Sequence, residues 1–357
     1  MRYLPCGVYH ENYAKDHAFW QTRFIRGKMI LLGIVSFFLI PFFLTDYLSE
    51  FILFIYWSMG ALGVQLLIGY CGQLTLGHAA FLAVGAYSSF LLMTLPWPQF
   101  LSDMGLVYPL VLLISGILSG IWCVLFGLPS ARVKGFYLIL TTMAAQFITV
   151  DFFIAKYVSQ IGGRQQDLTL SSELVKIGPW KIDSKTDIYY FGVFLLIIMV
   201  LGVANLLRSK AGRAWVAIRD NDIAAETMGI NVILYKLMAF FVSGFIGGLC
   251  GAFWGAYRNI ISVEDFMFGK SLWLVGIILI GGVGSLHGVF FGSLFMVFVL
   301  WLLQEIVGVI GGTGNIIYFK EIAFGLSICA FLIFEPNGIA YRWWQCKNYF
   351  NLWPFSY

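Results

Sequence analysis

Two glycine-rich segments, residues 69–78 and 281–288, carry uncharged polar side chains and a histidine between long apolar runs. Glycine lets the backbone leave the helical conformation, and irregular backbone at membrane depth survives only when it is buried in protein or lines a cavity. Paired interruptions in the two halves of a chain point to a transport site. The residues that could contact a small polar solute there are Gln73, Thr75, His78, Ser285 and His287.

Each segment also has a purely structural explanation. A tight turn between two helices uses glycine for close packing, and a single histidine beside an apolar run is more often structural than functional. The sequence therefore predicts two interrupted or re-entrant segments, and it leaves open whether His78 and His287 contact solute or only pack.

A third segment, residues 208–230, combines four basic residues with helix signals. Short helices are expected from Ala211 to Met228, and Gly229 is a natural helix stop. The length and helix signals favour docking of a soluble partner over an ordinary charged loop. The weakly apolar face that this segment could present to the partner consists of Ala214, Ala217, Ile218 and Ala225.

No pattern of residues indicates an enzyme. Gly269, Lys270 and Ser271 resemble the end of a phosphate-binding loop, but Glu264 stands where that motif needs a glycine. The sequence has no HExxH or GxSxG motif, and its six cysteines form no CxxC pair. We therefore expect no catalytic residue, no metal site and no cofactor bound by this chain itself.

The composition is that of an integral membrane protein. Hydrophobic residues make up 60% of the 357 residues and charged residues only 11%, whereas soluble domains carry about 25% charged residues. A net charge of +4 is too small to indicate nucleic-acid binding. Because each span must satisfy its own backbone hydrogen bonds in lipid, we expect an all-α, polytopic helical bundle.

Nine apolar runs are candidates for membrane crossings, and about 20 residues suffice for one crossing. The run 272–303 is too long for one upright helix and is interrupted at Gly281, so it is either two crossings or a helix with a re-entrant half-helix. The total is nine or ten, and we favour ten. The runs are 29–45, 51–68, 78–95, 107–128, 136–155, 189–207, 237–257, 272–303 and 316–334.

Lysine and arginine residues predict the orientation, because they accumulate in cytoplasmic loops. The basic tail 1–28 is expected in the cytoplasm, loop 46–50 outside, and loop 208–234 inside. Ten crossings return the basic C-terminal tail 341–357 to the cytoplasm, which is why ten is preferred. The membrane domain between the tails then spans residues 29–340.

Several motifs together resemble the LivH/LivM permeases of branched-chain amino-acid ABC importers, and the LivM branch most. The resemblance covers roughly residues 50–340. The motifs are GYCGQLTLGHAAFLAVGAY from Gly69, LPSARVKGFYLILTT from Leu128, RSKAGRAWVAIRDNDIAAETMGI from Arg208, YKLMAFFVSGFIGGLCGAFWG from Tyr235 and GGVGSLHGVFFG from Gly281.

The resemblance implies the ABC importer permease fold and a place in the cytoplasmic (inner) membrane of a bacterium or archaeon. The chain would form half of a path for branched-chain amino acids or related small polar solutes. Its partners would be a second, LivH-like permease, two cytoplasmic ATPases that use ATP, and a periplasmic solute-binding protein. Segment 208–234 would be the coupling loop on the ATPase, with Gly212, Arg213, Arg219, Asp220, Ala224, Ala225, Glu226 and Gly229 as its candidate residues.

Two departures from the family pattern leave the solute open. The external loop keeps only Gly162 and Gly163 of an expected Thr-Gly-Gly stretch, and Val289 replaces an expected proline. Permeases for urea or amides are therefore an alternative within the same family. A self-sufficient secondary carrier or channel is a further alternative, and charged residues within the spans would favour it.

Overall fold

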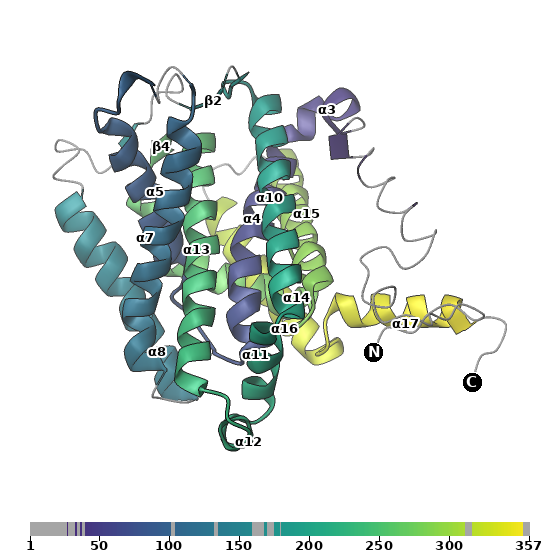
Figure 1. The fold of residues 1–357 in the computed structure, drawn as a ribbon. Helices are drawn as coiled ribbons and strands as arrows, with labels where there is room; N and C mark the ends of the chain where they lie inside the picture. The colour runs from purple at the N-terminus through teal and green to yellow at the C-terminus, as the bar shows by residue number, and fades with distance from the viewer. Residues whose placement is uncertain are drawn as a thin grey trace.

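A computed structural model describes residues 40–100, 104–131, 135–158, 168–169, 175–178, 180–310 and 316–352, with residues 27, 33, 36 and 37. Apart from residue 27, the expected N-terminal tail 1–28 lies outside the described residues, as do residues 29–32, 34, 35, 38 and 39 of the first expected span, 29–45. The chain is almost entirely helical, which confirms the expected all-α helical bundle (Figure 1).

The first half of the described chain contains five α-helices, a short 3-10 helix and two π-helical stretches. They are α3 (Ile40–Phe43), the 3-10 helix η2 (Thr45–Tyr47), α4 (Leu48–Gln65), the π-helix η3 (Leu66–Tyr70), α5 (His78–Thr94), α7 (Val107–Ser130), α8 (Phe136–Phe147) and the π-helix η4 (Ile148–Val158).

The second half begins after the short strands β1, β2 and β3. Its helices are α10 (Lys185–Arg208), α11 (Lys210–Asp220), α12 (Asp222–Thr227), α13 (Val232–Arg258), the 3-10 helix η6 (Val263–Phe266), α14 (Phe268–Gly281), α15 (Leu286–Ile310), α16 (Ile316–Phe334) and α17 (Ile339–Leu352). The strand pairs join β1 (Leu168–Thr169) to β4 (Ile260–Ile261) and β2 (Lys176–Ile177) to β3 (Trp180–Lys181).

Six of the described helical stretches are long and apolar enough to cross a membrane. A seventh candidate is the pair α16 and α17, whose axes differ by 46°. Helix α5 is shorter, with 17 residues, and α14 has only 14. Both of these short helices adjoin the glycine-rich segments, so the chain shortens its helices where it breaks them.

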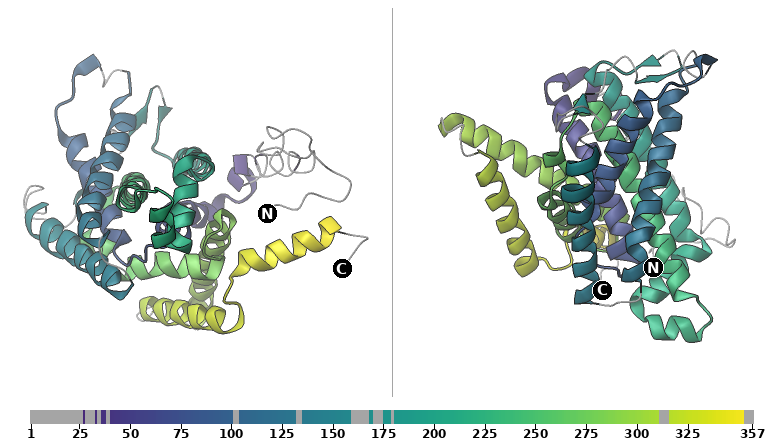
Figure 2. Two further views of the ribbon diagram at one scale, coloured as in Figure 1. Left: turned by 60° about the horizontal axis from the view of Figure 1, so that its bottom comes forward. Right: turned by 90° about the vertical axis from the view of Figure 1, so that its left-hand side faces the viewer.

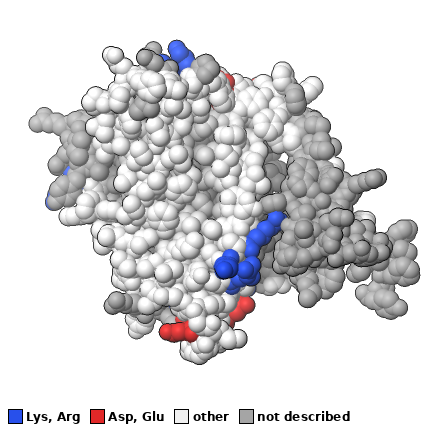
Figure 3. Space-filling model, in the orientation of Figure 1, with Lys and Arg blue, Asp and Glu red and all other residues white. Residues whose placement is uncertain are grey.

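The ends of the bundle are distinct. Elements α3, β2 and β4 lie at one end, and α11 and α12 lie at the other (Figure 1). This arrangement agrees with the expectation that loops 46–50 and 208–234 face opposite sides of the membrane. In the part that Figure 3 shows as described, the face between the two ends is mostly uncharged, and one cluster of basic side chains lies toward the α12 end.

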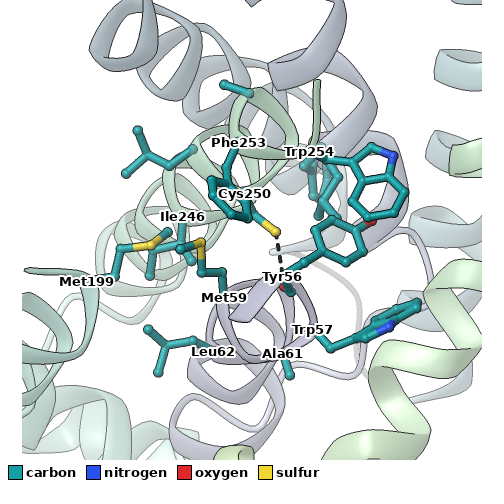
Figure 4. Packing of buried hydrophobic residues seen from close by; sticks show 14 of the residues in the cluster. Tyr56, Trp57, Met59, Ala61, Leu62, Met199, Ile246, Cys250, Phe253 and Trp254 are labelled. Carbon is teal, nitrogen blue, oxygen red and sulfur yellow. Dashed lines mark hydrogen bonds between the residues drawn. The ribbon is translucent and has the colours of Figure 1, made fainter. Parts of the chain in front are cut away.

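Helix α13 forms the centre of the bundle and packs on α4, α5 and α7. Its glycines permit close backbone approach, as small residues do between membrane helices. A Cβ atom added to Gly251 would lie 1.9 Å from the Leu82 carbonyl oxygen of α5. On the α4 side, the Cys250 thiol donates to the Tyr56 carbonyl oxygen at 3.3 Å inside a buried aromatic cluster (Figure 4).

The C-terminal residues expected as a tail form a helix instead. Helix α17 follows a turn at Gly338, whose φ of 73° is left-handed. It runs away from the bundle across the direction of the long helices (Figures 1 and 2).

Candidate functional site

The first break in a membrane helix lies where α4 runs into the π-helical turn η3 and stops at Cys71. The next residue, Gly72, has a φ of 71°, a conformation that favours glycine. The chain stays non-helical until α5 begins at His78. This confirms the predicted interruption, and single π-helical turns of this kind are frequent at functional sites.

The second break separates α14 from α15. Gly282 and Gly284 have φ values of 117° and 82°, so the backbone leaves the helix through two positive-φ glycines. The run 272–303, expected to be interrupted at Gly281, is therefore two helices joined by a tight turn.

The two breaks touch each other. A Cβ atom added to Gly69 would lie 2.7 Å from the Gly284 backbone nitrogen, so the backbones meet with no side chain between them. The buried Gln65 amide spans the junction: its Nε2 donates to the carbonyl oxygens of Gly282 at 3.2 Å and Ser285 at 2.9 Å. One neutral side chain thus bonds two backbone carbonyl groups of the second break, in addition to the Gly288 N–H and Ser285 hydroxyl bonds that these carbonyls accept within the break.

Arg219, near the end of α11, reaches into this junction. Its Nη1 donates to the Gly69 carbonyl oxygen at 2.8 Å. Its methylene groups lie over Gly72, where a Cβ atom would be 2.9 Å from the Arg219 Cγ. The same guanidinium pairs with the neighbouring Asp220 at 3.0 Å. The helix pair α11–α12 is therefore tied directly to the broken end of α4.

The N-terminus of α5 is satisfied by side chains from other helices. Helix N-termini leave backbone N–H groups without intrahelical acceptors, and here Thr142 accepts from Leu76 at 3.2 Å. The N–H of Ala79 donates to the Ser271 hydroxyl at 2.8 Å, and that of Ala80 donates to Gln146 Oε1 at 2.7 Å.

Gln146 also donates from Nε2 to the Phe266 carbonyl oxygen at 2.7 Å. Replacing it with leucine should destabilise the bundle by about 1–3 kcal/mol, because the buried Phe266 carbonyl loses its side-chain donor and the Ala80 N–H keeps only its 3.2 Å bond to the Gly77 carbonyl. The control is Thr141→Ala, since the Thr141 hydroxyl bonds only the Leu138 carbonyl of its own helix. Thermal unfolding in detergent checks the prediction, and equal midpoints for the two variants would contradict it.

A cavity of about 330 Å³ lies between the first break and the α11–α12 pair. Gln73 is among the residues that line it, and the Gln73 Oε1 is buried without a hydrogen-bond partner. Lys236 at the start of α13 is only 3% exposed and lies 3.7 Å from Asp222. Burial raises the pKa of the Cys71 thiol to about 12, so this group stays neutral. The lining residues are Cys71, Gly72, Gln73, Gly135, Leu138, Ile218, Arg219, Asp220, Asn221, Asp222 and Lys236.

The other predicted solute-contacting residues lie elsewhere. Thr75 is buried, and its hydroxyl accepts from the Gly77 N–H at 3.4 Å. His78 is fully buried beside Gly63 and Gly247, and its two ring nitrogens have no hydrogen-bond partner. Ser285 and His287 occupy the second break and the start of α15.

Ser285 helps to begin α15, because its hydroxyl accepts from the Gly288 N–H at 3.0 Å. His287 is exposed. The structure therefore brings Gln73 to the cavity and Ser285 to the junction, and it places His78 in a helix-packing position.

The apolar face predicted on residues 208–230 is turned toward the bundle. Ala214, Ile218 and Ala225 are buried against the rest of the bundle, and Trp215 beside them donates to the Tyr235 carbonyl oxygen at 2.8 Å. The prediction that this face meets a soluble partner is wrong, because the membrane bundle itself covers most of it.

The predicted helix stop is confirmed. Gly229 has a φ of 84°, and the Ile230 N–H closes the end of α12 on the Ala225 carbonyl at 3.1 Å. Gly212 packs against the Leu207 backbone.

The remaining side chains of this segment divide between the junction and the surface. Arg219 faces the junction of the breaks, while the other exposed candidates are Arg213, Asp220, Ala224 and Glu226.

Sequence reasoning missed the polar residues that hold the breaks. Each is a neutral amide or hydroxyl inside an apolar run, and burying such a group costs free energy unless it is hydrogen-bonded. A neutral amide or hydroxyl within an apolar run was therefore the signal that could have identified these residues. The missed residues are Gln65, Thr142, Gln146 and Ser271.

Comparisons with known proteins find permease components of transport systems. A family profile described as branched-chain amino acid transport system / permease component matches residues 47–331. The LivM high-affinity branched-chain amino acid permease of Escherichia coli (strain K12) is 28% identical over 265 residues, covering 68% of this chain and 60% of LivM. The Salmonella typhimurium LivM protein is 29% identical over the same length, with the same coverage.

A probable LivH permease of Methanocaldococcus jannaschii is 26% identical over 211 residues, which cover 58% of this chain and 65% of that protein. The match therefore spans less than two thirds of each of these relatives. No solved structure matches significantly.

Proposed function

Because this chain belongs to the family of permease components of branched-chain amino acid transport systems, we propose that it is the membrane-spanning subunit of an ATP-driven ABC importer. It forms half of a path for branched-chain amino acids or related small polar solutes, and it resides in a cytoplasmic membrane. A second, LivH-like permease supplies the other half of the path. Two ATPases bind on the cytoplasmic side, and a periplasmic protein delivers the solute.

The observation that carries this proposal is the link between α11–α12 and the breaks. The pair lies at one end of the bundle, where Ile223 is 67% and Met228 85% exposed. Exposed apolar side chains at the tip of a small helix suit docking into a partner. From the same pair, Arg219 binds the Gly69 carbonyl within the bundle. We assign this end to the cytoplasm and the docked partner to the ATPase.

The link suggests how ATP hydrolysis acts on the path. A partner can shift a conformational equilibrium only if its states bind the alternative conformations with different affinity. Movement of α11–α12 in the docked ATPase would pull or release Gly69, and the junction with Gly284 would transmit this to α15. Broken helices rearrange at their breaks, where fewer backbone hydrogen bonds oppose the change.

Reconstitution in liposomes tests the proposal. The complete set of two permeases, two ATPases and binding protein should accumulate leucine only with ATP, and this chain alone should neither accumulate leucine nor hydrolyse ATP. The extent to which isoleucine, valine, urea and acetamide inhibit leucine uptake ranks these solutes by their affinity for the importer. Accumulation by the isolated chain against a gradient would replace the proposal with a secondary carrier.

A further inference from the structure

Helix α17 lies beyond residues 47–331, the part of the chain that matches the family. It begins at the junction of the breaks: a Cβ atom added to Gly282 would lie 3.2 Å from the Ala340 Cβ and 3.1 Å from the Asn337 carbonyl oxygen. One turn further, the Trp343 ring packs on Phe291 of α15, with centroids 5.9 Å apart. The base of α17 is therefore fixed to the bundle.

The place where α17 starts is the boundary of the apolar surface. The last residues of α16, Ile333 and Phe334, are highly exposed apolar side chains, as suits contact with lipid. Glu335 follows at once, and it forms an ion pair with Arg342 of α17. A charged pair next to exposed phenylalanine marks the level at which hydrocarbon gives way to polar headgroups.

Helix α17 is too short to cross the membrane by itself. Its 14 residues span about 21 Å at 1.5 Å per residue, whereas the hydrocarbon core is about 30 Å thick. It projects sideways from the bundle (Figure 2, left). A helix that leaves a membrane bundle sideways at the headgroup level lies along the membrane surface.

The exposed side chains of α17 are those found in the headgroup layer. Tryptophan and tyrosine, with an apolar ring and a polar N–H or O–H group, concentrate at membrane interfaces. The helix carries two bases, Lys347 and the Arg342 that pairs with Glu335, and no acidic residue, so the charge of the helix itself is complementary to anionic lipid. Its exposed aromatic residues are Tyr341, Trp343, Trp344, Tyr349 and Phe350, the last of them 76% exposed.

We propose that α17 is a membrane-surface anchor that lies in the headgroup layer of the leaflet next to α11 and α12 and binds anionic lipid through its basic residues. Through Ala340 and Trp343 the anchor braces the break between α14 and α15. The proposal requires only that the bundle is in a membrane, so it does not depend on the importer assignment.

The native cysteines provide the test. Cys346 on α17 and Cys329 on α16 are exposed, whereas Cys71, Cys123 and Cys250 are buried. A nitroxide is attached to Cys346 after Cys329→Ala and Cys6→Ala, and to Cys329 in a matched variant with Cys346→Ala and Cys6→Ala. A third variant with Glu226→Cys, and with all three of those cysteines replaced, reports the aqueous side. Each is reconstituted in phosphatidylcholine vesicles with or without phosphatidylglycerol.

Accessibility to oxygen and to a water-soluble nickel chelate then gives the depth of each label. We expect Cys346 to lie between Cys329, inside the hydrocarbon, and position 226, in water. Phosphatidylglycerol should move the Cys346 label deeper, and Lys347→Gln should reduce that shift by at least about half, since a base near an anionic surface is worth roughly fivefold in affinity. Lys320→Gln, at the opposite end of α16, is the control and should leave the shift unchanged.

Two results would overturn the proposal. The first is a Cys346 label as accessible to the chelate as position 226, which would place α17 in solution. The second is a Cys346 label that lies in water when this chain is reconstituted alone and becomes shielded from both reagents when the second permease or the ATPases are added. That result would make α17 a protein-docking helix.

Discussion

Replacing Gly251 with alanine should separate α13 from α5 and strongly destabilise the bundle. The added Cβ atom would lie 1.9 Å from the Leu82 carbonyl oxygen and 2.9 Å from the Ala86 nitrogen. Both atoms belong to the α5 backbone, so no side-chain rotation relieves the overlap. Overpacking of this kind costs about 1–3 kcal/mol and sometimes more. We expect the upper end of that range, because a whole helix must move.

The measurement is the midpoint of thermal unfolding in detergent, which should fall by several degrees, as about 1–3 kcal/mol implies for a chain of this size. Gly202→Ala on α10 is the matched control, since nothing lies within 4 Å of its added Cβ atom. Alanine favours the helix by up to about 1 kcal/mol over glycine, so this control should be neutral or slightly stabilising. If the two variants unfolded at the same temperature, the close packing of α13 on α5 would be wrong.

The helical fold followed from the sequence because its main causes are local. Apolar runs of sufficient length predict crossings, and Gly72, Gly282, Gly284 and Gly229 each end or break a helix where the sequence suggested it. Positive φ at a glycine depends on the residue itself and its neighbours. Reading these positions required no knowledge of which helices pack together.

The contents of the junction could not be predicted, because they depend on pairings between distant residues. Gln65 and Gly282 are 217 positions apart, and Gln146 and Phe266 are 120 positions apart. Nothing in either local pattern indicates its partner. The wrong prediction for the apolar face of α11 has the same cause. The four-residue spacing shows that Ala214 and Ile218 share a face of the helix, but only the packing of the bundle determines what covers that face.

The same limit applies to Arg213 and Arg219, which the sequence treats alike and the structure separates. Both are basic residues of α11, six positions apart. The Arg213 guanidinium donates to the Arg208 carbonyl at 3.0 Å, within its own segment. The Arg219 guanidinium crosses to Gly69, 150 positions away, at 2.8 Å. If α11–α12 receives the ATPase, Arg219 is the residue that passes its movement to the breaks.

Arg219→Ala should therefore reduce ATP-driven leucine uptake at least about tenfold in the reconstituted importer, while ATP hydrolysis stays within about twofold. A hydrogen bond from a charged group is worth about 1.5–3 kcal/mol, and 1.4 kcal/mol corresponds to a factor of ten. Arg213→Ala, the matched control on the same helix, should change neither rate by more than about twofold, since an exposed charge contributes little.

Arg219→Lys separates transmission from charge alone. Lysine keeps the positive charge, but it lacks the planar fork with which arginine holds Gly69 and Asp220 at once. Uptake should recover only in part, and hydrolysis should again be unaffected. If the two alanine variants lost uptake equally, Arg219 would have no special role. If uptake and hydrolysis fell together in Arg219→Ala, the residue would serve the docking of the ATPase and not the movement of the broken helices.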